Sequence, residues 1–69
     1  MTKYRLVRFR DGGYGVAKGR WFFTEFVDLK NPDFCWTERS GFFKDCVGSR
    51  GRAEEVLKHL KTPLYTFVD

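Results

Sequence analysis

The sequence has no long apolar run, and this absence restricts the protein classes it can belong to. No stretch approaches the 18 apolar residues of a membrane span, so we expect no membrane helix. The first eight residues, MTKYRLVR, contain no hydrophobic region of the secretory type. We therefore expect a cytoplasmic protein whose cysteine thiols stay reduced.

Residues that carry chemistry are also scarce. The chain has one histidine and two cysteines, and these do not form a CxxC pair, so we expect no metal site. No serine or cysteine has a neighbouring base, and the glycine-rich DGGYG stretch leads into a strand rather than a phosphate-binding helix. The 69 residues allow one small domain with little room for a water-excluding site. We expect a protein without cofactor or enzymatic activity.

Aromatic residues and positive charge are abundant. Aromatic residues make up 19% of the chain, and the net charge is +4. So many rings exceed the needs of one small core, which predicts that some lie at the surface and contact a partner or a second copy. The charge is compatible with nucleic acid, a membrane surface or an acidic protein, and also with solubility alone.

The order of the elements predicts an α+β fold. Apolar periodicity indicates strands over about residues 4–47, a helix over about 50–61 and a possible edge strand over 64–68. In the helix, Ala53, Val56, Leu57 and Leu60 form one apolar stripe, Ser49 is the expected N-cap and Pro63 follows the end. The prediction is one domain, residues 1–69, with an antiparallel sheet of four to five strands and the helix packed on one face.

Three turns set the predicted strand register. A two-residue turn at Asp11-Gly12 would pair Val7 with Val16, and a turn at Gly19-Arg20 would pair Lys18 with Trp21. A weaker turn at Ser40-Gly41 would form a second hairpin. That hairpin would place Cys35 opposite Cys46, with Cα atoms about 5.5 Å apart, either as free thiols or as a disulfide.

This register divides the first three strands into two faces. The helix is expected on the more apolar face, which contains Val16, Val27 and Leu29 and has Arg5 at its rim. The opposite face would combine arginines with rings. The predicted binding residues, including two in the adjacent turn, are Tyr4, Arg8, Arg10, Lys18, Arg20, Phe22 and Phe26. Such a face suits a protein partner or unpaired nucleic acid. The alternatives are that the rings pack beneath the C-terminal segment or in a homodimer, and that the arginines are only solvated.

Two family resemblances bear on function. Strand YRLVRFR, the glycine turn with Tyr14 and Val16, and RAEEVL in the helix resemble the DNA-binding domains of plant ethylene-response factors and the arm-binding domains of tyrosine recombinases. The short, aromatic-rich sheet-plus-helix character also resembles small accessory proteins of tailed bacteriophages, including anti-CRISPR proteins. The phage resemblance implies an inhibitor that binds a host protein of a defence or nucleic-acid-handling system. The alternative is a module that binds nucleic acid directly through the basic aromatic face.

Overall fold

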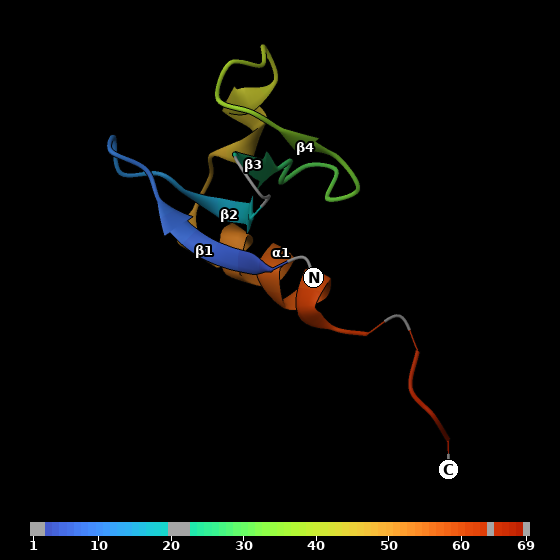
Figure 1. The fold of residues 1–69 in the computed structure, drawn as a ribbon. Helices are drawn as coiled ribbons and strands as arrows, with labels where there is room; N and C mark the ends of the chain where they lie inside the picture. The colour runs from blue at the N-terminus through green and yellow to red at the C-terminus, as the bar shows by residue number, and fades with distance from the viewer. Residues whose placement is uncertain (1–2, 20–22, 64, 69) are drawn as a thin grey trace.

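The described residues form an antiparallel sheet with one helix packed against it. The computed structural model describes residues 3–19, 23–63 and 65–68. Within them, the elements are β1 (Tyr4–Arg8), β2 (Tyr14–Gly19), β3 (Thr24–Val27), β4 (Cys35–Trp36), the 3₁₀ helix η1 (Phe43–Cys46) and α1 (Arg50–Lys61). The four strands are antiparallel neighbours in sequence order. Figure 1 shows α1 beneath β1 and β2. The predicted α+β class is confirmed.

Helix α1 has the predicted bounds. The Ser49 hydroxyl accepts a hydrogen bond from the Arg52 backbone N–H at 3.1 Å, which confirms the N-cap. At the other end, the Thr62 N–H bonds back to the Lys58 carbonyl, and Pro63 follows. These signals are local, since each acts within a few residues of the chain, and this explains why the sequence predicts the helix well.

The core lies between α1 and one face of the sheet. Its fully buried aliphatic residues are Val16, Val27, Leu29, Ala53 and Val56. Because β2 and β3 supply Val16, Val27 and the adjoining Leu29, the predicted helix-covered face is correct for these two strands. The apolar stripe of α1 completes this layer.

The first hairpin has a longer turn than predicted. Its loop contains three residues, Arg10, Asp11 and Gly12. The Phe9 N–H donates to the Gly13 carbonyl at 2.7 Å, and Gly12 has a positive φ of 99°. A left-handed glycine that closes a three-residue loop is a common hairpin solution. Leu6 therefore pairs with Val16, and the predicted pairing of Val7 with Val16 is wrong by one residue.

This one-residue difference turns β1 over, because successive side chains of a strand point to opposite faces. Tyr4, Leu6 and Arg8 lie on the helix side of the sheet, where Tyr4 and Leu6 pack against the core. Arg5 and Val7 lie on the other side. The prediction had placed Tyr4 and Arg8 on the face away from the helix and Arg5 on the helix-covered face, so the face assignment of β1 is corrected.

The connection between β2 and β3 is also longer than predicted. Lys18 pairs with Glu25 rather than with Trp21, a shift of four residues. Because the shift is even, Phe26 and Val27 stay on their predicted faces. Trp21 and Arg20 lie outside the described residues.

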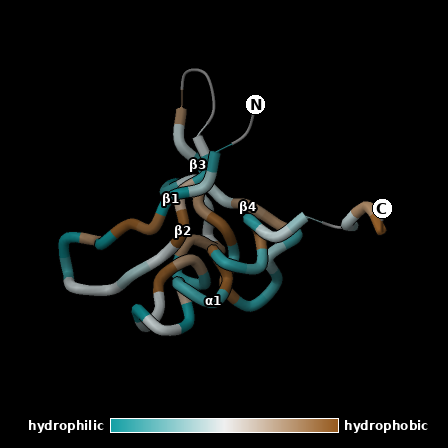
Figure 2. The backbone as a smooth tube through the Cα atoms, turned by 90° about the horizontal axis from the view of Figure 1, so that it is seen from below, coloured by the Kyte–Doolittle hydropathy of each residue, from teal (hydrophilic) through white to brown (hydrophobic). Residues whose placement is uncertain are grey.

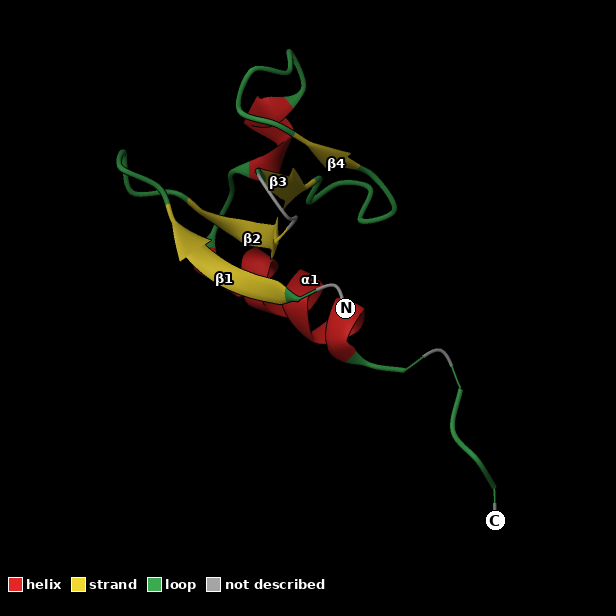
Figure 3. Ribbon diagram, viewed as in Figure 1, coloured by secondary structure: helices red, strands yellow, loops and turns green. Residues whose placement is uncertain are grey.

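The second predicted hairpin does not form. Strand β4 pairs with β3, and residues 43–46 form η1 instead of a returning strand. Cys35 is opposite Val27, and Cys35 and Cys46 are not joined in a disulfide. Figure 3 shows the sheet between η1 and α1. Two β-turns, in which the Phe34 N–H donates to the Asn31 carbonyl and the Ser40 N–H to the Thr37 carbonyl, connect these elements without a further strand.

The predicted edge strand at 64–68 is also wrong for its described part. Residues 65–68 have no regular structure, and Tyr65 and Phe67 are 69% and 82% exposed. This segment leads away from the body as a tail with a hydrophobic end (Figures 1 and 2). Its β-forming composition was insufficient because no sheet edge lies beside it to supply hydrogen bonds.

Candidate functional site

The sheet face away from α1 is covered by rings. Phe9, Phe26 and Phe43 form a triad with centroid distances of 5.4 to 5.5 Å and tilted or edge-to-face contacts. All three residues are half-buried. Phe43 belongs to η1, so the triad attaches this 3₁₀ helix to β3. Edge-to-face packing is a favourable aromatic arrangement, and we assign this inner triad a structural role.

A second group of rings lies further out. The Trp36 ring stacks on Phe42 at 4.7 Å and lies nearly parallel to Phe34 at 6.0 Å. Phe34 and Phe42 are 52% and 55% exposed. Because Trp36 pairs with Phe26 across β3 and β4, this stack continues the inner triad on the same face of the sheet. We call Phe34, Trp36 and Phe42 the aromatic surface.

Asp28 holds the aromatic surface in place. Its carboxylate is buried and accepts hydrogen bonds from the Trp36 indole N–H at 2.9 Å and from the backbone N–H groups of Lys30 and Asn31 at 2.8 and 3.1 Å. Burial by itself raises the pKa of Asp28, but these three bonds and the Lys30 charge outweigh burial and leave the pKa below its ordinary value. One ionised side chain therefore shapes the loop before Phe34 and orients Trp36.

The Cys46 thiol beneath this region is buried and its pKa is raised. Cys46 is fully buried, and its Sγ lies 3.4 Å from the Phe26 carbonyl. Burial, followed by the negative charge of Asp28, raises the pKa of Cys46 to about 11. A thiol that is protonated at neutral pH is a poor nucleophile. In the described part of the chain, no group of three or more His, Cys, Asp or Glu side chains is placed to hold a metal ion.

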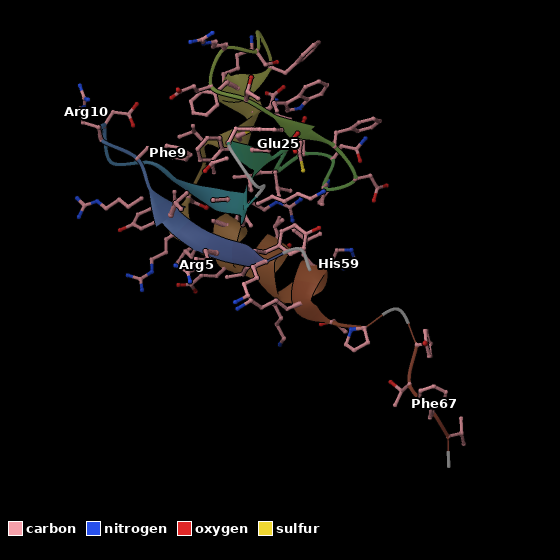
Figure 4. All side chains as sticks on the ribbon, viewed as in Figure 1. Arg5, Phe9, Arg10, Glu25, His59 and Phe67 are labelled. Atoms are coloured by element: carbon pink, nitrogen blue, oxygen red, sulfur yellow. The ribbon has the colours of Figure 1, made fainter. Side chains whose placement is uncertain are left out.

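The predicted binding residues do not gather on one surface. Tyr4, Arg8 and Lys18 belong to the helix side of the sheet, and Tyr4 packs against the core. Arg10 is at the exposed tip of the first hairpin (Figure 4). Phe26 lies on the opposite face, within the inner triad. Arg20 and Phe22, which were also predicted to bind, lie outside the described residues. The slipped register of β1 is the physical reason for this dispersal.

Charge and exposed rings are also segregated along the chain. Residues 3–19 contain five basic side chains and one acidic one, whereas residues 28–46 contain three basic and four acidic ones. The aromatic surface therefore sits in a nearly neutral, slightly acidic lobe, and the excess positive charge lies on the β1–β2 hairpin. The basic and the aromatic character that the sequence interpretation combined on one face are thus found in different parts of the molecule.

The sequence interpretation missed the aromatic surface and its anchor. Two local signals existed. Phe34 and Trp36 are two residues apart, which places them on the same side of an extended segment. Asp28 precedes Asn31-Pro32, and an aspartate before a turn often accepts bonds from the next backbone N–H groups. No local sequence signal indicated that Phe42, which follows the next turn, would stack on Trp36.

Comparisons with known proteins found no relative. No family model matches the chain, no curated protein matches it, and no solved structure matches it. In the part of the chain that the structure describes, α1 is too short and too polar to cross a membrane.

Proposed function

We propose that this chain is a non-catalytic binding protein that docks on another protein through the aromatic surface. The observation that carries the proposal is the stack of three rings in which Phe34 and Phe42 are each more than half exposed. Leaving adjacent large rings in water costs free energy that burial against a partner would recover. Tryptophan and other rings are frequent among the residues that dominate protein interfaces.

The rings of the aromatic surface are already ordered in the unbound protein. The hydrogen bond from Trp36 to Asp28 and the contacts of Trp36 with both phenylalanine rings restrict its rotation. A side chain that is already ordered loses less conformational entropy on binding. The proposal therefore places Trp36 at the centre of the interface, with Phe34 and Phe42 on either side of it.

The surrounding charge favours a protein over nucleic acid as the occupant. Single-stranded nucleic acid binds where stacking rings lie beside a basic groove. Here the lobe of residues 28–46 has more acidic than basic side chains, so a phosphate backbone would gain no net attraction. A host protein with an apolar recess and a neutral or basic rim fits this surface. The resemblance to phage accessory proteins suggests that such binding would inhibit a defence or nucleic-acid-handling protein.

The test compares two ring-removal variants of the full chain. The double variant Phe34→Ala/Phe42→Ala removes two of the three rings of the aromatic surface, and Phe67→Ala removes a still more exposed ring from the tail as a control. We expect a host protein that the wild type and Phe67→Ala bind with the same affinity, and that the double variant binds at least about 100-fold more weakly. The affinity of the wild type and of each variant for the host protein is measured with purified proteins.

Two other outcomes would overturn the proposal. Light scattering that shows a dimer of the wild type, and a monomer of the double variant, would make a second copy the occupant. Anisotropy of labelled single-stranded DNA that depends on Phe34 and Phe42, with an affinity that falls steeply with salt, would make nucleic acid the occupant. Circular dichroism checks that the double variant is folded.

A further inference from the structure

Strand β1 forms one edge of the sheet and bonds to a neighbouring strand on one side only. In an antiparallel pair, residues whose backbone groups bond to the partner strand alternate with residues whose groups point away from it. The Lys3 carbonyl, just before β1, accepts a bond from Gly19 at 3.1 Å. The Phe9 N–H, just after β1, donates to Gly13 at 2.7 Å. The odd-numbered residues of β1 therefore bond to β2, and the even-numbered ones direct their N–H and C=O groups outward.

The outward backbone groups of β1 belong to Tyr4, Leu6 and Arg8. Within residues 3–19, 23–63 and 65–68, no loop or turn supplies a backbone hydrogen bond to them. An open edge of this kind is a template for another strand. Two β1 edges would pair poorly, because the exposed Arg5 and Arg8 side chains of one copy would lie beside those of the other. The edge therefore suits a strand without positive charge.

The tail, residues 65–68, has the composition of such a strand. Its Tyr65 and Phe67 rings contact each other edge to face, with centroids 5.3 Å apart. Residues two positions apart lie on the same side of an extended segment, so this contact is the one that a strand would make. Residues 62–69 contain one aspartate and no basic side chain. The arginines of β1 would therefore not repel the tail.

The tail leaves α1 in a direction that separates it from β1 of its own copy. Thr62, at the end of α1, is extended, with φ −78° and ψ 128°. Pro63 follows, and a proline disfavours a helical conformation at the residue before it. Figure 1 shows the chain beyond α1 running away from the sheet. One molecule thus has an open sheet edge and a separate β-forming segment that does not cover it.

We propose that the tail of one copy adds to the outer edge of β1 in a second copy, as a fifth strand. Backbone groups of the tail would bond to the outward groups of Leu6 and Arg8. The Tyr65 and Phe67 rings would lie over Val7 and the stem of Arg5, on the face of the sheet that α1 leaves open. Each copy has one such edge and one tail, so reciprocal exchange closes the assembly at a dimer.

The dimer would leave the aromatic surface free for the proposed protein partner. Strands β1 and β4 are opposite edges of the sheet, and Trp36 belongs to β4. The two proposals are therefore separable by mutation. Phe67→Ala should weaken the dimer without changing the affinity for the host protein, and Phe34→Ala/Phe42→Ala should have the opposite effect.

Light scattering of the full chain over a concentration series tests for the dimer. We expect the mean mass to rise from 8.2 kDa towards twice that value between about 10 μM and about 1 mM, since so small a contact is weak. Arg8→Pro removes an outward N–H and no bond to β2, and edge strands tolerate proline at such positions. It should weaken the dimer at least about tenfold, because the N–H is lost at both contacts. Arg8→Ala is the matched control that keeps the N–H, and it should change the affinity less than about twofold.

Mixed-label NMR of the wild type identifies the contact without any variant. Equal amounts of isotope-labelled and unlabelled chain are mixed, and nuclear Overhauser effects between the two kinds of copy are selected. We expect them between the Tyr65 and Phe67 rings and the methyl groups of Val7. Circular dichroism checks that Arg8→Pro is folded, and the mixed-label experiment decides the question if it is not.

Four results would overturn the proposal. The first is a wild type that stays monomeric up to about 1 mM. The second is equal weakening by Arg8→Pro and Arg8→Ala, which would assign the effect to the side chain rather than to the backbone edge. The third is contact between tail and β1 within one copy only. The fourth is a dimer that Arg8→Pro leaves intact and Phe34→Ala/Phe42→Ala abolishes, which would place the second copy on the aromatic surface.

Discussion

The two faces of the sheet differ in the type of side chain that covers them and in how deeply those side chains are buried. The face beneath α1 is aliphatic, and Val16, Val27 and Val56 are at most 2% exposed. The other face is aromatic, and its rings become more exposed from the inner triad to Phe34 and Phe42. A small helix can cover only one face, so the second face is closed in part by η1 and left open beyond it. The difference indicates that stability resides mainly beneath α1, whereas the outer rings are left exposed for the proposed partner.

The largest expected loss of stability is at Gly15, where the aromatic face of the sheet is as tightly packed as the aliphatic face. A Cβ at Gly15 would collide with the Cys46 carbonyl and with the Phe9 ring. We expect Gly15→Ala to lower the free energy of unfolding by about 3 kcal/mol, because neither backbone nor triad can move freely. Urea denaturation measures this loss. Gly41→Ala is the control, since nothing lies within 4 Å of its Cβ, and an equal loss there would contradict the packing argument.

The next effect compares the two faces directly. Val27→Ala removes buried methyl groups beneath α1 and should cost about 2 kcal/mol. Phe42→Ala removes a larger side chain that is 55% exposed and should cost less than about 0.5 kcal/mol. The melting temperature should therefore fall by roughly 10 °C for the first variant and hardly at all for the second. Similar losses would mean that the outer rings are part of the core.

Asp28 links the aromatic surface to stability through pH. Its pKa in the folded protein is lowered, so its contribution to stability is present above the ordinary carboxyl pKa and is lost as the pH falls through the lowered value. Asp28→Asn should cost about 1–2 kcal/mol at pH 7, because three hydrogen bonds lose their charged acceptor. The difference in free energy of unfolding between the variant and the wild type should become smaller below about pH 4.

Urea midpoints at several pH values test this linkage. Asp33→Asn, on the exposed part of the same loop, is the matched control and should leave the midpoint nearly unchanged at all pH values. If the difference in urea midpoint between Asp28→Asn and the wild type stays constant down to pH 2, packing rather than ionisation explains how Asp28 contributes to stability.

The smallest expected effect is on the rate at which a thiol reagent modifies Cys46. With a pKa of about 11, only about one Cys46 thiol in a thousand is ionised at pH 8. In a Cys35→Ser variant, a thiol reagent should modify Cys46 only when the protein opens, so that denaturant accelerates the reaction. Rapid modification of the folded variant would mean that the region beneath the rings is open to water.

Local features of the sequence were sufficient for some elements and insufficient for others. The helix begins at Arg50 and ends at Lys61 as predicted, because Ser49, the apolar stripe and Pro63 all act within a few residues. In the first hairpin, the two candidate turns differ by one residue and use the same Asp-Gly pair. The sequence could not separate them, and this single ambiguity placed Tyr4 and Arg8 on the wrong face.

The sequence by itself therefore determined the α+β class, the helix and the aliphatic side of β2 and β3, since these depend on periodicity and on capping residues. Only the tertiary structure decided which rings lie together and where the positive charge lies. Phe42 reaches Trp36 across a turn, and Asp28 reaches Trp36 from the preceding loop. Such contacts join residues far apart in sequence, and no local preference encodes them. The aromatic surface is a product of these contacts between separate segments.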